Sequence, residues 1–182
     1  GYIEESGVAQ HYRDMRIAPI YEGTNGIQAM DLVGRKLGLR MGAVVNGHLQ
    51  NMRDTDAQLE AAGNEFESMR AGLAESVQSL AGVTEWIMTN GLADPVQALA
   101  GATPYLRIFG TVTGGWLLTK QALAAQAELD AGSTDTEYLA AKITTARFFA
   151  EQILPQAAGL VPSVQAGASA LYEVDGSSLA SI

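Results

Sequence analysis

The residues best suited to chemistry in this chain lie between positions 12 and 28. Glu22 stands there with the apolar residues Ile17, Ile20 and Ile27 close by in the sequence. A carboxylate that is desolvated by such neighbours has a raised pKa, as a general base working near neutral pH requires. The same spacing is also compatible with a solvated Glu22 that takes no part in a reaction.

The residues that follow Glu22 are typical of a turn that leads into a helix. Gly23 allows a ligand to approach the backbone closely. We expect a helix that begins at Ile27 and runs to about Leu39, with Thr24 or Asn25 as its cap. Free N–H groups at such a helix start suit a phosphate or another anion. A simple cap without a ligand remains the alternative.

Few other side chains in the sequence are suited to chemistry. We expect Arg13, Asp14 and Arg16 to form a structural ion pair rather than to reach a cofactor phosphate. His11 and His48 are expected at the surface. Because the chain has 2 histidines and 0 cysteines, a multi-histidine metal cage and a cysteine nucleophile are excluded. The sequence predicts no metal site.

Composition excludes several classes of protein. The 182 residues include 11 Lys+Arg and 20 Asp+Glu, for a net charge of −9, so no basic footprint for nucleic acid is present. Residues 108–118 carry no charge, but they are too few and too rich in glycine to span a bilayer. We expect a soluble, cytoplasmic, acidic protein. The chain opens without methionine and with a helical pattern already running, so we expect the back part of a longer protein.

Apolar residues recur every three or four positions in three long stretches, which predicts three long helices. No alternating strand pattern of useful length is present, so we predict an all-α antiparallel bundle. The three stretches consist of Phe66, Met69, Leu73, Val77, Leu80, Val83 and Ile87; Tyr105, Ile108, Phe109, Val112, Trp116 and Leu123; and Leu139, Ile143, Ala146, Ala150 and Ile153.

Turn and capping residues predict where these helices begin and end. We expect a stop at Asn90-Gly91, then starts at Asp94-Pro95 and Thr103-Pro104. Residues 134–137 fit a capping box, and Pro155 is expected to interrupt the last helix.

Each glycine inside the second long helix costs about 1 kcal/mol of helix stability relative to alanine. Glycines there therefore indicate a close helix crossing, and a local kink is the alternative. They are Gly110, Gly114 and Gly115.

Charge divides the chain into two parts. Residues 1–40 hold five acids and five bases, whereas residues 41–182 hold fifteen acids and six bases. We therefore predict one unit at residues 1–41, a helical domain at residues 42–176, and a tail at residues 177–182.

Three segments resemble the C-terminal motif of the flavin-dependent acyl-CoA dehydrogenases. They are Gly1-Tyr2, Tyr12-Arg13-Asp14-Met15-Arg16-Ile17, and Ile20-Tyr21-Glu22-Gly23-Thr24-Asn25-Gly26-Ile27-Gln28. The helical domain after residue 41 is similar to the extra C-terminal domain of a longer branch, which includes 3-methylthiopropanoyl-CoA and broad-range fatty acyl-CoA dehydrogenases. The resemblance implies the last elements of the family's C-terminal helical bundle, followed by an added antiparallel helical bundle.

The resemblance also implies a reaction and a site. Glu22 would be the catalytic base that removes the α-proton of an acyl-CoA, while the β-hydrogen leaves as hydride to FAD and a trans-2-enoyl-CoA forms. The Glu22 N–H would help to hold the enolate oxygen. Many relatives carry a longer polar residue at position 26. The other implied contacts are Tyr21 and Gly23 along the acyl channel, and Thr24, Asn25 and Gly26 against FAD.

Partners follow from the same resemblance. It implies an acyl-CoA substrate, electron-transfer flavoprotein as the electron acceptor, and a homo-oligomer. Most of the family's FAD and CoA contacts lie in segments that precede this one, so we expect the isolated chain to hold no flavin tightly and to be inactive. The alternative is a self-standing helical module for assembly, without catalysis.

Overall fold

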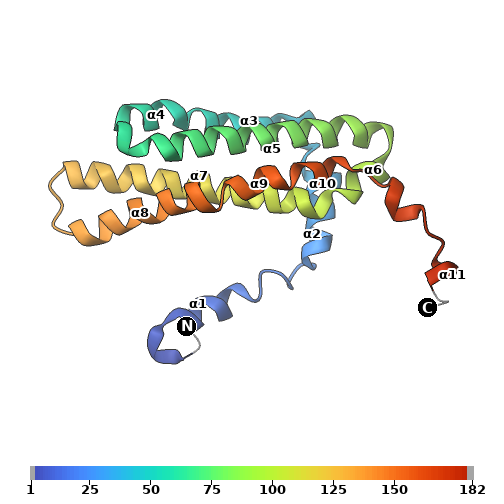
Figure 1. Cartoon of the computed structure of the whole chain (residues 1–182), viewed down its shortest axis with the longest axis horizontal. Helices are drawn as coiled ribbons and strands as arrows, with labels where there is room; N and C mark the ends of the chain where they lie inside the picture. The colour runs from blue at the N-terminus through green and yellow to red at the C-terminus, as the bar shows by residue number, and fades with distance from the viewer. Residues whose placement is uncertain (1–2, 180–182) are drawn as a thin grey trace.

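The computed structural model describes residues 3–179, and these residues form an all-α protein without strands (Figure 1). Gly1-Tyr2 of the family motif and residues 180–182 of the expected tail lie outside the described residues. The long helices are α5 (Glu67–Ala93), α7 (Ala102–Asp130) and α8 (Thr136–Gln152). The shorter elements are η1 (Glu4–Ser6), α1 (Val8–Met15), α2 (Asn25–Asp31), η2 (Leu32–Lys36), η3 (Leu39–Gly42), α3 (Ala43–Arg53), α4 (Thr55–Ala62), η4 (Asn64–Phe66), α6 (Pro95–Ala100), α9 (Pro155–Gly159), α10 (Val161–Gln165), η5 (Ser169–Tyr172) and α11 (Gly176–Leu179).

Helix α7 runs antiparallel to both α5 and α8, with α3 and α4 lying along α5 and with α9 and α10 continuing the line of α8 (Figure 1). The expected apolar stripes supply about half of the buried apolar residues. Their buried members are Phe66, Met69, Leu73, Val77, Leu80, Val83, Ile87, Tyr105, Ile108, Val112, Leu139, Ile143, Ala146 and Ala150. Periodicity therefore predicted both the helices and the faces that they bury.

The ends of the long helices differ from the sequence expectation at three places. Helix α5 continues through Asn90-Gly91 to Ala93, where the Asp94 N–H donates to the Asn90 carbonyl. Helix α7 begins at Ala102 rather than after Thr103, so Pro104 lies in the first turn, where its missing N–H costs no hydrogen bond.

The third difference is at the start of α8, where no side chain caps the helix and the predicted capping box does not form. The Ser133 hydroxyl instead accepts the Asp135 N–H at 3.3 Å. Two other predictions are confirmed. The Asp94 carboxylate caps α6 with Pro95 in the first turn, and the chain restarts as α9 at Pro155.

One of the three glycines in α7 marks a close crossing. A Cβ on Gly115 would lie 2.6 Å from Leu154 Cδ2, and Leu154 is fully buried. A Cβ on Gly114 would meet Phe149 Cζ at an ordinary 3.8 Å, and one on Gly110 would meet nothing within 4 Å. The crossing therefore explains Gly115, and the expectation for Gly110 is wrong.

His48 is partly covered by α7 rather than fully exposed, so the expectation of a surface residue is only partly correct. It is half-buried on α3, and its Nε2 lies 3.1 Å from Thr113 Oγ1 of α7. Its ring stacks on Phe109 and meets the edge of Trp116. Burial in this setting lowers the pKa of the imidazole. His11 is exposed, as predicted.

The segment before α3, here called the N-terminal arm (residues 3–42), begins away from the bundle and ends packed on it. Helix α2 continues into the π-helix η2 and packs on α7, whereas η1 and α1 lie away from the long helices (Figure 1). Large apolar side chains along this arm are exposed. They are Ile3, Val8, Tyr12, Met15, Ile17, Ile20, Tyr21, Ile27 and Met30.

Candidate functional site

The candidate site lies in the loop between α1 and α2, and both ends of the loop have defined geometry. After α1 ends at Met15, the N–H groups of Ile20 and Tyr21 both donate to the Ile17 carbonyl at 3.0 Å. Helix α2 then begins at Asn25, two residues earlier than the sequence predicted. Asn25 and Gly26 therefore form its first turn.

Glu22 and Gly23 lie in left-handed backbone conformations at the centre of this loop. Their φ angles are 55° and 117°. A Cβ on Gly23 would lie 2.9 Å from Ile27 Cγ2, so glycine is required here by both its conformation and its close neighbour. A non-glycine residue with positive φ, as at Glu22, is uncommon and occurs often at functional sites.

Gln28 holds this backbone in place. Its Nε2 donates to the Glu22 carbonyl at 2.9 Å, and its N–H donates to the Thr24 carbonyl at 2.9 Å. No role for Gln28 was predicted from the sequence. The signal that could have found it is its position one turn into the helix, from which a long amide side chain reaches back to the loop.

The carboxylate of Glu22 is exposed. Ile17, Ile20 and Ile27 are themselves 57%, 57% and 51% exposed, so the described residues do not build the apolar enclosure that was expected around it. Tyr21 is also exposed.

Backbone donors at the loop are free within the described residues. The N–H groups of Glu22, Gly23 and Thr24 donate to no other group there, and the Thr24 hydroxyl makes no capping bond. A Cβ on Gly26 would meet nothing within 4 Å. The loop can therefore offer backbone donors to a polar ligand that approaches from outside this chain.

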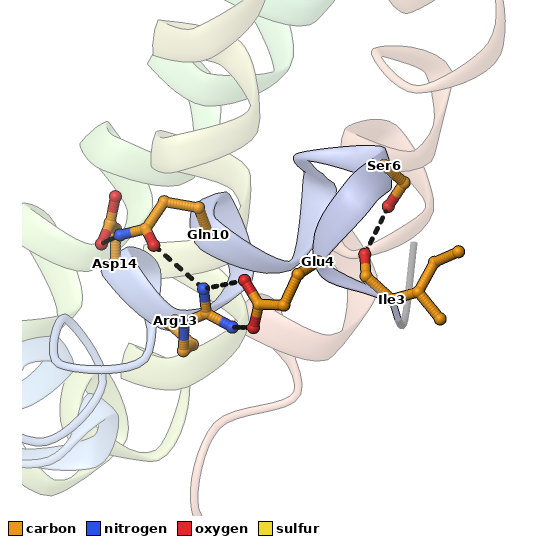
Figure 2. A network of polar contacts seen from close by, with 6 residues as sticks. All are labelled: Ile3, Glu4, Ser6, Gln10, Arg13 and Asp14. Atoms are coloured by element: carbon orange, nitrogen blue, oxygen red, sulfur yellow. Dashed lines mark hydrogen bonds and ion pairs between the residues drawn. The ribbon is translucent and has the colours of Figure 1, made fainter.

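The charged residues of the arm form a network of their own (Figure 2). Arg13 binds both carboxylate oxygens of Glu4, at 2.8 and 3.1 Å, and also the Gln10 side chain at 3.0 Å. Asp14 accepts from Gln10 at 2.6 Å. A structural ion pair of Arg13 is thus present, but it joins Arg13 to Glu4 of η1 rather than to a residue across the bundle. No ion pair of Arg16 and no metal-binding cluster occurs among the described residues.

Two family models match the chain. The model described as "Acetyl-CoA dehydrogenase C-terminal like" matches residues 44–175, and "Acyl-CoA dehydrogenase, C-terminal domain" matches residues 1–37. Within the described residues, no helix is long and apolar enough to cross a membrane.

Curated relatives carry names of the same kind. The chain is 42% identical over 154 residues to 3-methylmercaptopropionyl-CoA dehydrogenase of Ruegeria pomeroyi, covering 85% of this chain and 26% of that protein. It is 32% identical over 167 residues to a broad-specificity linear acyl-CoA dehydrogenase of Mycobacterium tuberculosis, with the same coverage of 85% and 26%. It is 30% identical over 170 residues to a butyryl-CoA dehydrogenase of Syntrophomonas wolfei, covering 91% and 27%. The chain thus spans about a quarter of the length of these relatives.

Proposed function

Since this chain belongs to the acyl-CoA dehydrogenase family, we propose that it forms the C-terminal part of an FAD-dependent enzyme that oxidises an acyl-CoA thioester to a trans-2-enoyl-CoA. We assign residues 1–41 to the end of the family's C-terminal helical domain and residues 42–176 to an added helical bundle domain, followed by a tail at residues 177–182. Part of this tail lies in the short helix α11.

Glu22 is the proposed catalytic base. Its carboxylate takes the α-proton of the acyl-CoA, and the left-handed backbone at Glu22 and Gly23 is the single observation that carries this role. The α-proton is only weakly acidic, so the developing enolate oxygen needs hydrogen-bond donors. The free N–H of Glu22 supplies one of them. Because Glu22 is exposed in this chain, the apolar surroundings of the proposed base would come from the substrate and from other parts of the complete enzyme.

The residues after Glu22 fit FAD along their backbone, because the Thr24 hydroxyl makes no capping bond and the space beside Gly26 is open. Thr24, Asn25 and Gly26 would hold the cofactor, which when bound accepts the β-hydrogen as hydride. Tyr21 and Gly23 would line the acyl channel. A single exposed loop does not enclose a flavin, so the isolated chain is proposed to bind FAD weakly and to be inactive.

The proposed partners are those of the family. The complete enzyme acts on an acyl-CoA, passes electrons to electron-transfer flavoprotein and forms a homo-oligomer.

A matched set of variants in the complete enzyme tests the role of Glu22. The change Glu22→Gln should lower turnover by about 10² to 10⁴, as expected for loss of a general base, with the FAD content unchanged. The control Glu65→Gln alters an exposed carboxylate far along the chain and should leave turnover unchanged. Turnover by Glu22→Gln at the wild-type rate would overturn the assignment.

A second candidate function is supported by the bundle itself. Its core extends from Ala29 of α2 to Val164 of α10 and includes no residue of the Glu22 loop. A helical assembly module without catalysis would have such a core. If the purified 182-residue chain with added FAD shows a bound-flavin spectrum that bleaches with an acyl-CoA, this second candidate is excluded. A chain that retains no flavin but melts cooperatively supports it for the isolated segment.

A further inference from the structure

Gln28 joins helix α2 to the Glu22 loop through two hydrogen bonds. Its side-chain Nε2 donates to the Glu22 carbonyl at 2.9 Å, and its backbone N–H donates to the Thr24 carbonyl at 2.9 Å. The amide nitrogen also lies close to Gly23, since a Cβ added at Gly23 would meet it at 3.6 Å. One residue of α2 therefore binds the loop on both sides of Gly23.

The bond to the Glu22 carbonyl fixes the peptide unit that follows Glu22. Because a peptide unit is planar and trans, a carbonyl held toward Gln28 directs the N–H of Gly23 the opposite way. Glu22 has a left-handed φ of 55°, which is unfavourable for a residue with a Cβ and persists only where surrounding contacts hold it. Among the residues that the structure describes, no other side chain hydrogen-bonds to the backbone of Glu22. The direction of the Glu22 side chain therefore depends on Gln28.

Helix α2 is itself anchored on the long helix α7, so Gln28 has a fixed place from which it binds the loop. Ala29, the next residue, is fully buried in the core, and α2 packs on α7. Gln28 is half-buried and lines one groove together with Phe109 and Thr113 of α7. A half-buried amide on a packed helix loses fewer conformations when it binds a carbonyl than a fully exposed amide does.

We propose that Gln28 is a positioning residue for Glu22: its amide holds the Glu22–Gly23 peptide so that the Glu22 carboxylate meets the α-proton of the substrate. This role rests on the function proposed for Glu22, and it assigns Gln28 no contact with the substrate or with FAD. Proton removal depends steeply on geometry, because a misplacement of about 1 Å can lower a rate by about 100-fold. Loss of the Gln28 donor should therefore slow proton removal and leave the binding of acyl-CoA and FAD nearly unchanged.

Three variants of the complete enzyme test this role through exchange of the α-proton with D₂O, measured per bound FAD and without an electron acceptor. Gln28→Met removes the donor and keeps the length of the side chain. It should slow both exchange and kcat by about 10- to 100-fold, with KM for the acyl-CoA within about 2-fold of wild type. Gln28→Lys restores a donor at the end of a long side chain and should recover most of the lost rate. The control Gln126→Met removes a 2.8 Å amide bond to Asp130 on α7 and should exchange at the wild-type rate.

A double variant shows whether Gln28 acts through Glu22. Adding Gln28→Met to Glu22→Gln should slow exchange by less than about 2-fold further, because the group that Gln28 positions is already absent. The role of Gln28 is overturned by a full additional loss in the double variant, by wild-type exchange in Gln28→Met, or by equal losses in Gln28→Met and Gln28→Lys. Wild-type exchange by Glu22→Gln alone instead overturns the proposed base, and the role of Gln28 with it.

Discussion

The contact between Gly115 and Leu154 makes a quantitative prediction about the packing of α7. The change Gly115→Ala places a Cβ 2.6 Å from Leu154 Cδ2 and 2.9 Å from its Cγ, and Leu154 is fully buried and cannot swing into solvent. Forcing an extra carbon into a packed core costs about 1–3 kcal/mol. Replacing glycine by alanine inside a helix gains about 1 kcal/mol.

Gly110 is the matched control, because it lies in the same helix and a Cβ there would meet nothing within 4 Å. Gly110→Ala should therefore gain only the higher helix propensity of alanine, which raises the free energy of unfolding by about 1 kcal/mol. Since that term is common to both variants, their difference isolates the cost of the contact, about 1–3 kcal/mol. In a protein of this size the two melting temperatures should differ by about 2–12 °C, from about 2–4 °C per kcal/mol.

Urea denaturation followed by circular dichroism measures both variants on the same chain. The expected order of stability is Gly110→Ala, then wild type, then Gly115→Ala at or below wild type. If Gly115→Ala is as stabilising as Gly110→Ala, Leu154 does not pack against the backbone of α7 and the description of this crossing is wrong.

Three further predictions concern pH and stability. The Arg70 guanidinium holds the pKa of the Asp56 carboxyl below its usual value of 3.8. Wild type should therefore be more stable than Arg70→Gln above pH 3.8, and this difference in the free energy of unfolding should disappear as the pH falls below 3.8. Urea titrations at several pH values measure the difference. Burial lowers the pKa of His48 below its usual 6.5, so the unfolded chain binds the proton first and stability should fall as the pH drops below 6.5; His48→Gln should flatten this dependence in the same titrations. Burial raises the pKa of Tyr105 to about 12, so the free energy of unfolding should fall as the pH rises above 10. In an alkaline titration followed by absorbance at 295 nm, the tyrosine that ionises at the highest pH should be missing in Tyr105→Phe.

The helices were predictable from sequence because apolar periodicity reports directly on burial. The seven apolar positions from Phe66 to Ile87 are all buried in the structure. Local caps were less predictable, because several side chains can satisfy the same backbone group. At α8 the predicted capping box does not form, and the Ser133 hydroxyl instead accepts the Asp135 N–H just before the helix.

At the candidate site, too, some features were predictable from the sequence and others were not. The sequence indicated the turn at Glu22 and Gly23, since glycine next to a helix start is a local signal. The bond from Gln28 to the Glu22 carbonyl and the stacking of His48 on Phe109 depend on contacts that local sequence patterns do not encode. The apolar neighbours of Glu22 in sequence are exposed in space, because the described residues form no surface over them.

The most direct test of the central claim, that Glu22 accepts the α-proton, is exchange of that proton with solvent. The complete enzyme is incubated in D₂O with an acyl-CoA and no electron acceptor, and deuterium at the α-carbon is measured by mass spectrometry. The wild type should incorporate deuterium, and Glu22→Gln with its FAD retained should incorporate it at least about 10² more slowly. Incorporation by Glu22→Gln at the wild-type rate would show that another group removes the proton.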